Sequence, residues 1–320
     1  KERAGKSPYG GVLTGVAALN ILMCMVSQIP FAPEASGLTY SGPLALERFA
    51  GRPSHPDLLF AHGFGQTRLA WSRAARQLAA QGYPGTSFDA RGHGQSRWNP
   101  PDQDYALEQF ADDLTRLADE HARPPVLVGA SMGGLLGMFA QTHRAPPPFR
   151  ALVLADITPR WEAAGVERIL GFMTAHPQGF DSLEHAADEI AGYLPHRARK
   201  SPADLEKILF RTPAGRWRWH WDPRMVDAIG RRGEEYQAHL VEAARRIEVP
   251  VLLVSGGRSE LVNDAHVREF LTLVPHAQHV RLPEATHMVV GDDNDAFTRT
   301  ISAFLTTLHA DGPTSRGESR

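Results

Sequence analysis

Residues 126–134 have the sequence Val-Leu-Val-Gly-Ala-Ser-Met-Gly-Gly, and the rest of the chain is organised around them. Its apolar first part predicts a buried strand, and residues 135–141 predict a helix. The Gly129-x-Ser131-x-Gly133 pattern between them is typical of a nucleophile elbow, a tight strand–turn–helix connection. Glycine is expected at both outer positions because a Cβ there would meet the crossing backbone. Ser131 would then present its hydroxyl at a helix N-terminus, whose dipole favours negative charge.

A pattern of this kind also occurs by chance around an ordinary serine, so the flanking sequence has to support it. Strands and helices alternate on both sides, which indicates a mostly parallel sheet covered on both faces by helices. Ligands bind at the carboxyl ends of such strands, and several polar residues follow predicted strands there: His62, Asp89, Ser131 and Asp156. Apolar or alternating runs predict strands at 44–49, 57–61, 86–89, 125–128, 151–156, 249–254 and 279–282.

The pattern changes in residues 157–247, which contain helix-like segments and no convincing strand. We expect this segment to form a helical cap over the strand ends of a core made by residues 37–156 and 248–310. The cap contains many tryptophans, and these serve either internal packing or the wall of a substrate pocket. Trp161 and Trp219 are the candidate substrate contacts.

Composition limits the kind of protein. The chain has 320 residues, of which 42% are hydrophobic and 22% charged, and this suits one large α/β domain with an insert. A net charge of -2 argues against a nucleic-acid partner. The single cysteine, Cys24, excludes an intrachain disulfide framework and a cysteine-rich zinc site. The 15 histidines show no metal-ligand spacing, so we expect no metal and no organic cofactor.

The N-terminal extension, residues 1–36, allows several interpretations. It starts with basic residues, and residues 12–26 are mostly apolar, which resembles the first two regions of a secretory signal. The apolar run is short and interrupted for a membrane-spanning helix, and no clear cleavage site follows it. A signal, an anchor and a segment foreign to the native protein all stay open. We expect a cytoplasmic protein, with export or tethering through residues 1–30 as the alternative, and a flexible tail at 311–320.

A serine hydroxyl is a weak nucleophile and needs a base, which in turn needs an orienting acid. His287 is the expected base because it stands in a short loop between the last predicted strand and the closing helix. Glu260, in the loop after the preceding strand, is the favoured acid. Asp156, one strand earlier, is the alternative, and Asp264 ranks third. These residues occur in the order serine, acid, histidine.

The oxyanion formed during acyl transfer needs two backbone donors. We expect one to be the N–H of Met132, the residue after the nucleophile, and the other to be the N–H of Phe64. The Phe64 side chain is also a candidate substrate contact. His62 and His93 are expected to shape the loops rather than to act as bases.

With these residues the chain resembles the α/β-hydrolase superfamily, in the cap-bearing branch that holds esterases, cofactor-free haloperoxidases and C–C hydrolases. The resemblance implies an α/β-hydrolase fold with a helical cap inserted after the sixth strand. Related epoxide hydrolases and haloalkane dehalogenases use an aspartate nucleophile, so the serine at 131 argues against both. The chain departs from the pattern at Ser259-Glu260, where aspartate is common. The matching motifs are His62-Gly63-Phe64-Gly65, Asp89-Ala90-Arg91-Gly92-His93-Gly94-Gln95-Ser96, residues 129–134, residues 250–260 and Thr286-His287-Met288.

The expected activity is therefore the hydrolysis of a carboxylic ester, or a related lactone or thioester, through an acyl-enzyme on Ser131. The partner would be a small-molecule substrate with a hydrophobic portion, and the oligomeric state stays open. A vinylogous C–C hydrolase or a cofactor-free perhydrolase would use the same triad. A non-catalytic ligand-binding protein on the same fold is the alternative from another class.

Overall fold

The computed structural model describes residues 38–195, 197–292 and 294–310. The expectations for residues 1–36 and for the tail at 311–320 lie outside these ranges. The strands are β1 (Leu38–Ser41), β2 (Leu44–Phe49), β3 (Leu58–Ala61), β4 (Gly85–Phe88), β5 (Val126–Ala130), β6 (Ala151–Ala155), β7 (Leu209–Arg211), β8 (Trp217–Trp219), β9 (Val251–Gly256) and β10 (Gln278–Leu282).

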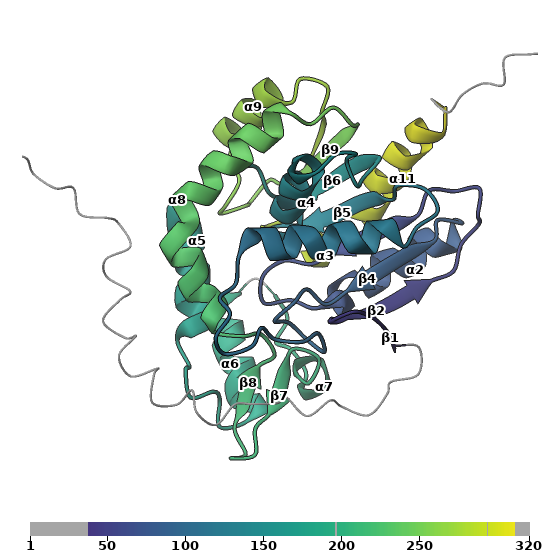
Figure 1. The fold of residues 1–320 in the computed structure, drawn as a ribbon. Coiled ribbons are helices and arrows are strands. Elements are labelled where there is room, and N and C mark those ends of the chain that lie inside the picture. Colours follow the sequence, from purple (N-terminus) through teal and green to yellow (C-terminus); the bar gives the residue numbers. More distant parts are fainter. Residues whose placement is uncertain (1–37, 196, 293, 311–320) are drawn as a thin grey trace, which may run out of the picture.

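Eight of these strands form one sheet in the order β1-β2-β4-β3-β5-β6-β9-β10 (Figure 1). In this order β1 and β2 form an antiparallel edge. The other strands of the sheet run parallel to one another: β4, β3, β5, β6, β9 and β10. The expected α/β fold with a mostly parallel sheet is confirmed. Successive side chains on a strand point to opposite faces. On β3, accordingly, Leu59 belongs to one hydrophobic cluster and Phe60 to another across the sheet.

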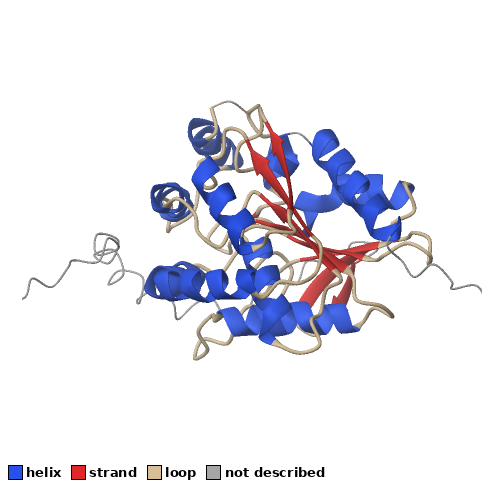
Figure 2. Cartoon of the chain, turned by 90° about the horizontal axis from the view of Figure 1, so that it is seen from above, coloured by secondary structure: helices blue, strands red, loops and turns tan. Residues whose placement is uncertain are grey.

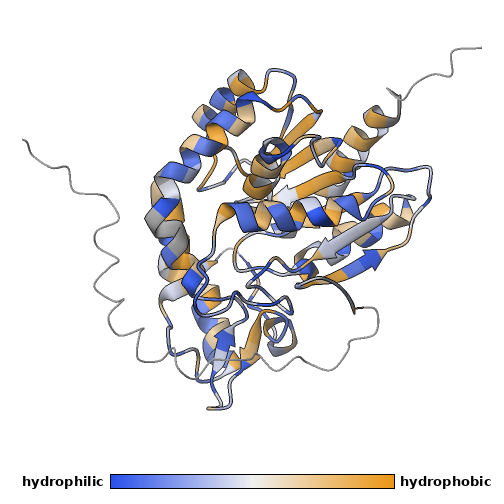
Figure 3. Ribbon diagram, viewed as in Figure 1, coloured by the Kyte–Doolittle hydropathy of each residue, from blue (hydrophilic) through white to orange (hydrophobic). Residues whose placement is uncertain are grey.

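Helices cover both faces of the sheet, and Figure 2 shows the strands between the two layers. In Figure 3 the central strands are apolar, whereas the helices that flank them also carry hydrophilic residues. One layer contains α3 (Leu107–Asp119), α4 (Met132–His143), α8 (Arg224–Arg245) and α9 (Asp264–Leu273). The other contains α2 (Ser72–Ala80) and α11 (Asn294–Ala310), with the short helices η3 (Arg68–Trp71) and α10 (Val289–Asp292).

The cap is inserted after β6, the sixth strand, as expected, and lies at the lower left of Figure 1. It contains α5 (Ala163–Thr174), α6 (Leu183–Tyr193) and α7 (Pro202–Leu205). Two features differ from the expectation of a purely helical segment. Strands β7 and β8 pair as an antiparallel hairpin, and the C-terminal half of α8 packs on α4, where it helps to cover the sheet.

No helix within the described ranges combines the length and the apolar character needed to cross a membrane.

Candidate active site

Ser131 stands at the turn between β5 and α4, in the strand–turn–helix context expected from the sequence. Its backbone has φ 47° and ψ -116°, a conformation that L-residues rarely adopt and that stores strain at functional sites. A Cβ on Gly129 would lie 2.6 Å from the backbone of Gly133, and one on Gly133 would lie 2.3 Å from the carbonyl oxygen of Ala61. The elbow therefore crosses its own backbone and that of β3, which is why it needs both glycines.

His287 lies in the loop between β10 and α10, and 10% of its side chain is exposed. Its Nδ1 is 2.8 Å from Oδ2 of Asp156, a fully buried carboxylate at the end of β6. Two further donors reach that carboxylate. The N–H of Gly256 donates to Oδ1 at 2.7 Å, and the hydroxyl of Ser259 donates to Oδ2 at 2.5 Å. Such donors stabilise the ionised form of a buried carboxylate and fix its orientation.

The preference for Glu260 as the partner of His287 is wrong. Glu260 does follow β9, but its carboxylate pairs with Arg168 of α5, with Nη1 and Oε2 2.6 Å apart, and 33% of the side chain is exposed. The residue before it, Ser259, turns toward Asp156 instead, and its hydroxyl also accepts the N–H groups of Leu261 and Val262. This turn directs Glu260 away from the imidazole. Asp264, the third alternative, pairs with Arg281 at 2.8 Å.

The turn that carries Phe64 adjoins Ser131, because a Cβ on Gly63 would lie 3.4 Å from the Cβ of Ser131. Gln66 closes this turn: its side chain accepts the N–H of Gly63, and its own N–H donates to the Gly63 carbonyl. Met132 is the first residue of α4. Within the described ranges, neither the Phe64 N–H nor the Met132 N–H donates to another group. Both donors expected at the oxyanion therefore remain available to a ligand.

Two buried histidines hold this turn in place. His62 donates from Nδ1 to the Gly63 carbonyl at 2.8 Å and accepts the Ala90 N–H at Nε2 at 2.9 Å. His93 accepts the Gly65 N–H at Nε2 at 3.2 Å. Burial lowers the pKa of His62, and it lowers the pKa of His93 well below its usual range. Neutral rings with occupied nitrogens shape loops and do not act as bases, as the sequence led us to expect.

Phe64 faces an aromatic residue that the sequence did not single out. Its ring centroid lies 4.9 Å from that of Trp221, and Met173 of α5 rests against the same turn, since a Cβ on Gly65 would lie 2.3 Å from Met173 Cε. Trp161 is half-buried at the edge of the core. Trp219 packs on Phe180 at 5.5 Å in the hydrophobic cluster of the cap, which is the packing role weighed for it.

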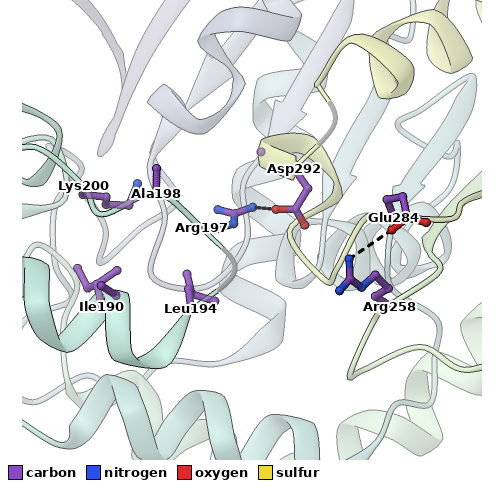
Figure 4. Close-up of a pocket in the computed structure, with 10 residues that line it drawn as sticks. Ile190, Leu194, Arg197, Ala198, Lys200, Arg258, Glu284 and Asp292 are labelled. Carbon is purple, nitrogen blue, oxygen red and sulfur yellow. Dashed lines mark hydrogen bonds and ion pairs between the residues drawn. The ribbon is translucent and has the colours of Figure 1, made fainter.

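A cavity of about 420 Å³ opens between the cap and the core (Figure 4). Of the described residues, neither Ser131 nor His287 lines it. Arg197 of the cap pairs there with Asp292, whose Oδ2 accepts the N–H and the hydroxyl of Thr286 at 2.8 and 2.5 Å. Burial opposes the charge on Asp292, but these hydrogen bonds outweigh it and lower the pKa of the carboxyl. The cap is thus tied to the loop that carries His287.

Comparison with known proteins identifies the family of the chain. The model of the alpha/beta hydrolase family matches residues 58–300, so the chain belongs to that family. It is 28% identical to 3-hydroxybutyrate-oligomer hydrolase of Cupriavidus necator, covering 80% of this chain and 92% of that protein. It is 27% identical to 2-(acetamidomethylene)succinate hydrolase of Mesorhizobium japonicum, covering 79% and 88%.

Among solved structures, the crystal structure of E-2-(acetamidomethylene)succinate hydrolase superimposes with a TM-score of 0.71 at 25% identity, covering 82% of this chain and 95% of that one. These relatives are hydrolases, and the chain spans most of their length. The protein is a hydrolase with an α/β-hydrolase fold.

Proposed function

We propose that the protein is a serine hydrolase of carboxylic esters that acts through an acyl-enzyme on Ser131. The observation that carries the proposal is the 2.8 Å contact between His287 Nδ1 and the buried Asp156 carboxylate. A histidine held in this way presents Nε2 as the base, because the carboxylate fixes the proton on Nδ1. The strained serine at the elbow is the nucleophile that such a base would serve.

In the proposed reaction His287 Nε2 accepts the hydroxyl proton of Ser131 as Oγ attacks the ester carbonyl carbon. The N–H groups of Phe64 and Met132 stabilise the negative oxygen. The protonated imidazole then donates its proton to the leaving alkoxide, and the acyl-enzyme forms. A water molecule, deprotonated by the same nitrogen, releases the acid and restores the hydroxyl. Asp156 stabilises the imidazolium in both halves of the reaction.

The proposed substrate is a short ester of a hydroxy acid with a hydrophobic portion. The name of one relative supports this class, since that relative acts on 3-hydroxybutyrate oligomers, which are esters of a hydroxy acid. Apolar side chains beside the oxyanion turn, Phe64, Met173 and Trp221, offer a surface for the hydrophobic portion. Trp161 stays a candidate contact at the edge of the core.

The test is turnover of p-nitrophenyl butyrate and of 3-hydroxybutyrate dimer by the wild type and by Ser131→Ala. We expect the variant to lose activity by about 10⁴-fold or more while keeping its fold. Ser54→Ala, at an exposed serine in a loop, is the control and should retain wild-type rates. A Ser131→Ala variant within tenfold of the wild type would contradict the proposal, and a folded wild type that cleaves no ester would favour a binding role.

A further inference from the structure

Two histidines and a glutamate of the cap meet at its surface, away from the groups proposed for catalysis. His176 follows the C-terminal end of α5, and His185 and Glu189 lie one turn apart on the same face of α6. One ligand atom from each of the three side chains lies within 4.8 Å of the other two. We propose that this cluster, His176, His185 and Glu189, binds a divalent transition-metal ion, with Zn²⁺ the best match.

The spacing of the ligand atoms is close to what a zinc ion requires. Bonds of about 2.0–2.2 Å in a tetrahedral site place neighbouring ligand atoms about 3.3 Å apart. Oε2 of Glu189 lies 3.3 Å from Nε2 of His176, and Oε1 of the same carboxylate lies 3.8 Å from Nε2 of His185. Small side-chain rotations on half-exposed residues are therefore enough to bring the atoms around an ion.

Packing and a backbone contact hold the two imidazoles in place. The fully buried ring of Phe180 lies 4.7 Å from the ring of His176 and 5.7 Å from that of His185, so both pack on one rigid platform. Nδ1 of His185 accepts the backbone N–H of Asp181 at 3.4 Å, which holds the ring against the loop before α6.

The donor set also selects the class of ion. Two imidazole nitrogens and one carboxylate suit Zn²⁺ and its neighbours among the transition metals, whereas Mg²⁺ and Ca²⁺ prefer oxygen ligands throughout. Three protein ligands leave a fourth position for water. The expectation of no metal rested on sequence spacing, and His176 joins the other two only through the packing of the segment after α5 against α6.

A bound ion would join the segment after α5 to α6 and so brace the cap. The test uses tag-free protein, treated with chelator, dialysed and then titrated with CoCl₂ and ZnCl₂. We expect one Co²⁺ per chain, with the visible absorption bands of a four-coordinate site, and displacement of Co²⁺ by Zn²⁺. Zinc should also raise the Tm of the wild type in a concentration-dependent way, because it binds the folded state.

His185→Ala should weaken binding at least about tenfold and abolish the Tm shift. Glu189→Gln, which keeps the shape of the side chain, should weaken binding in the same direction. His143→Ala is the matched control, because its imidazole lies 3.9 Å from the Asp112 carboxylate, away from the cluster, and it should bind like the wild type. Unchanged affinity in His185→Ala, or no Co²⁺ bound below about 1 mM, would overturn the proposal.

Discussion

Three donors, two from the end of β9 and the loop after it and one from the histidine loop, satisfy the buried carboxylate of Asp156. The Gly256 N–H, the Ser259 hydroxyl and Nδ1 of His287 all reach its carboxylate. Its own backbone has a positive φ of 49°, a second strained residue beside Ser131. A buried carboxylate with satisfied oxygens and an imidazole partner is what the proposed proton transfer needs.

Asp156→Asn should therefore reduce kcat for ester hydrolysis by about 10⁴-fold, because an amide can favour the wrong tautomer of His287. Glu260→Gln is the matched control: it removes one charge from a surface pair with Arg168, and kcat should stay within a fewfold of the wild type. Steady-state kinetics on both variants, at equal folded fraction by circular dichroism, decide the matter. A larger loss in Glu260→Gln would reverse the assignment.

Residue patterns singled out Ser131 and His287 but favoured Glu260 over Asp156 as the acid, and the structure explains why. Strands β6 and β9 are neighbours, with Ala155 opposite Val254, so Asp156 and the residues after β9 approach the histidine loop from adjacent strand ends. Which carboxylate turns inward depends on Ser259, whose hydroxyl bonds both to Asp156 and to the loop that follows. Such a local turn leaves no periodic trace in the sequence.

At the scale of elements, the elbow joins β5, α4 and β3 through backbone contacts. Gly133 lies so close to β3 that any side chain would meet the Ala61 carbonyl. The three atoms nearest to an added Cβ all belong to Ala61 of β3 and cannot rotate away, so an added methyl group has to shift the strand or the helix. The geometry of the nucleophile and the packing of the sheet therefore depend on the same residue.

Gly133→Ala should lower the free energy of unfolding by at least about 2 kcal/mol, since overpacking against fixed structure is destabilising. Gly192→Ala is the control: it is also a helical glycine, on α6, with no atom within 4 Å of an added Cβ. That variant should be neutral or stabilising by up to about 1 kcal/mol. Urea unfolding of both proteins measures the difference. Equal stability of Gly133→Ala and the wild type would contradict the contact.

The sheet was predictable because its central strands are continuous apolar runs, whereas the β7–β8 hairpin was not. Each hairpin strand has three residues, and β8, Trp217–Trp219, mixes tryptophan with arginine. Its pairing is supported by packing on Phe180 and by a bridge between Phe180 and Trp217. These contacts come from distant segments, so local sequence favoured neither a strand nor a helix.

At the scale of the whole molecule, buried polar contacts join the cap to the core. His220 follows β8 and accepts the Gly94 N–H at Nδ1 at 3.1 Å, and Asp222 accepts the hydroxyl of Tyr105 at 2.8 Å. Burial lowers the pKa of His220 to about 4 from the ordinary 6.5. The neutral ring is therefore part of the contact between the cap and the core.

This lowered pKa makes stability depend on pH. Because folding lowers the pKa of His220, its contribution to the free energy of unfolding is complete above pH 6.5. That contribution is lost as the pH falls toward 4. The loss between about pH 7.5 and about pH 4 amounts to about 3 kcal/mol. His220→Asn keeps an acceptor for Gly94 without a titrating ring. Between these two pH values its free energy of unfolding, measured in urea, should therefore fall by about 3 kcal/mol less than that of the wild type. Identical pH dependence in both proteins would contradict the assignment.

Mass spectrometry of the trapped adduct tests the proposed acyl-enzyme on Ser131 without relying on rates. Protein treated with a fluorophosphonate, or quenched in acid during turnover of p-nitrophenyl butyrate, would be digested and mapped. We expect one adduct per chain on the peptide that contains Ser131, its absence in Ser131→Ala, and its slow formation in Asp156→Asn. Ester turnover without an adduct at Ser131, or an adduct on another residue that persists in Ser131→Ala, would contradict the account.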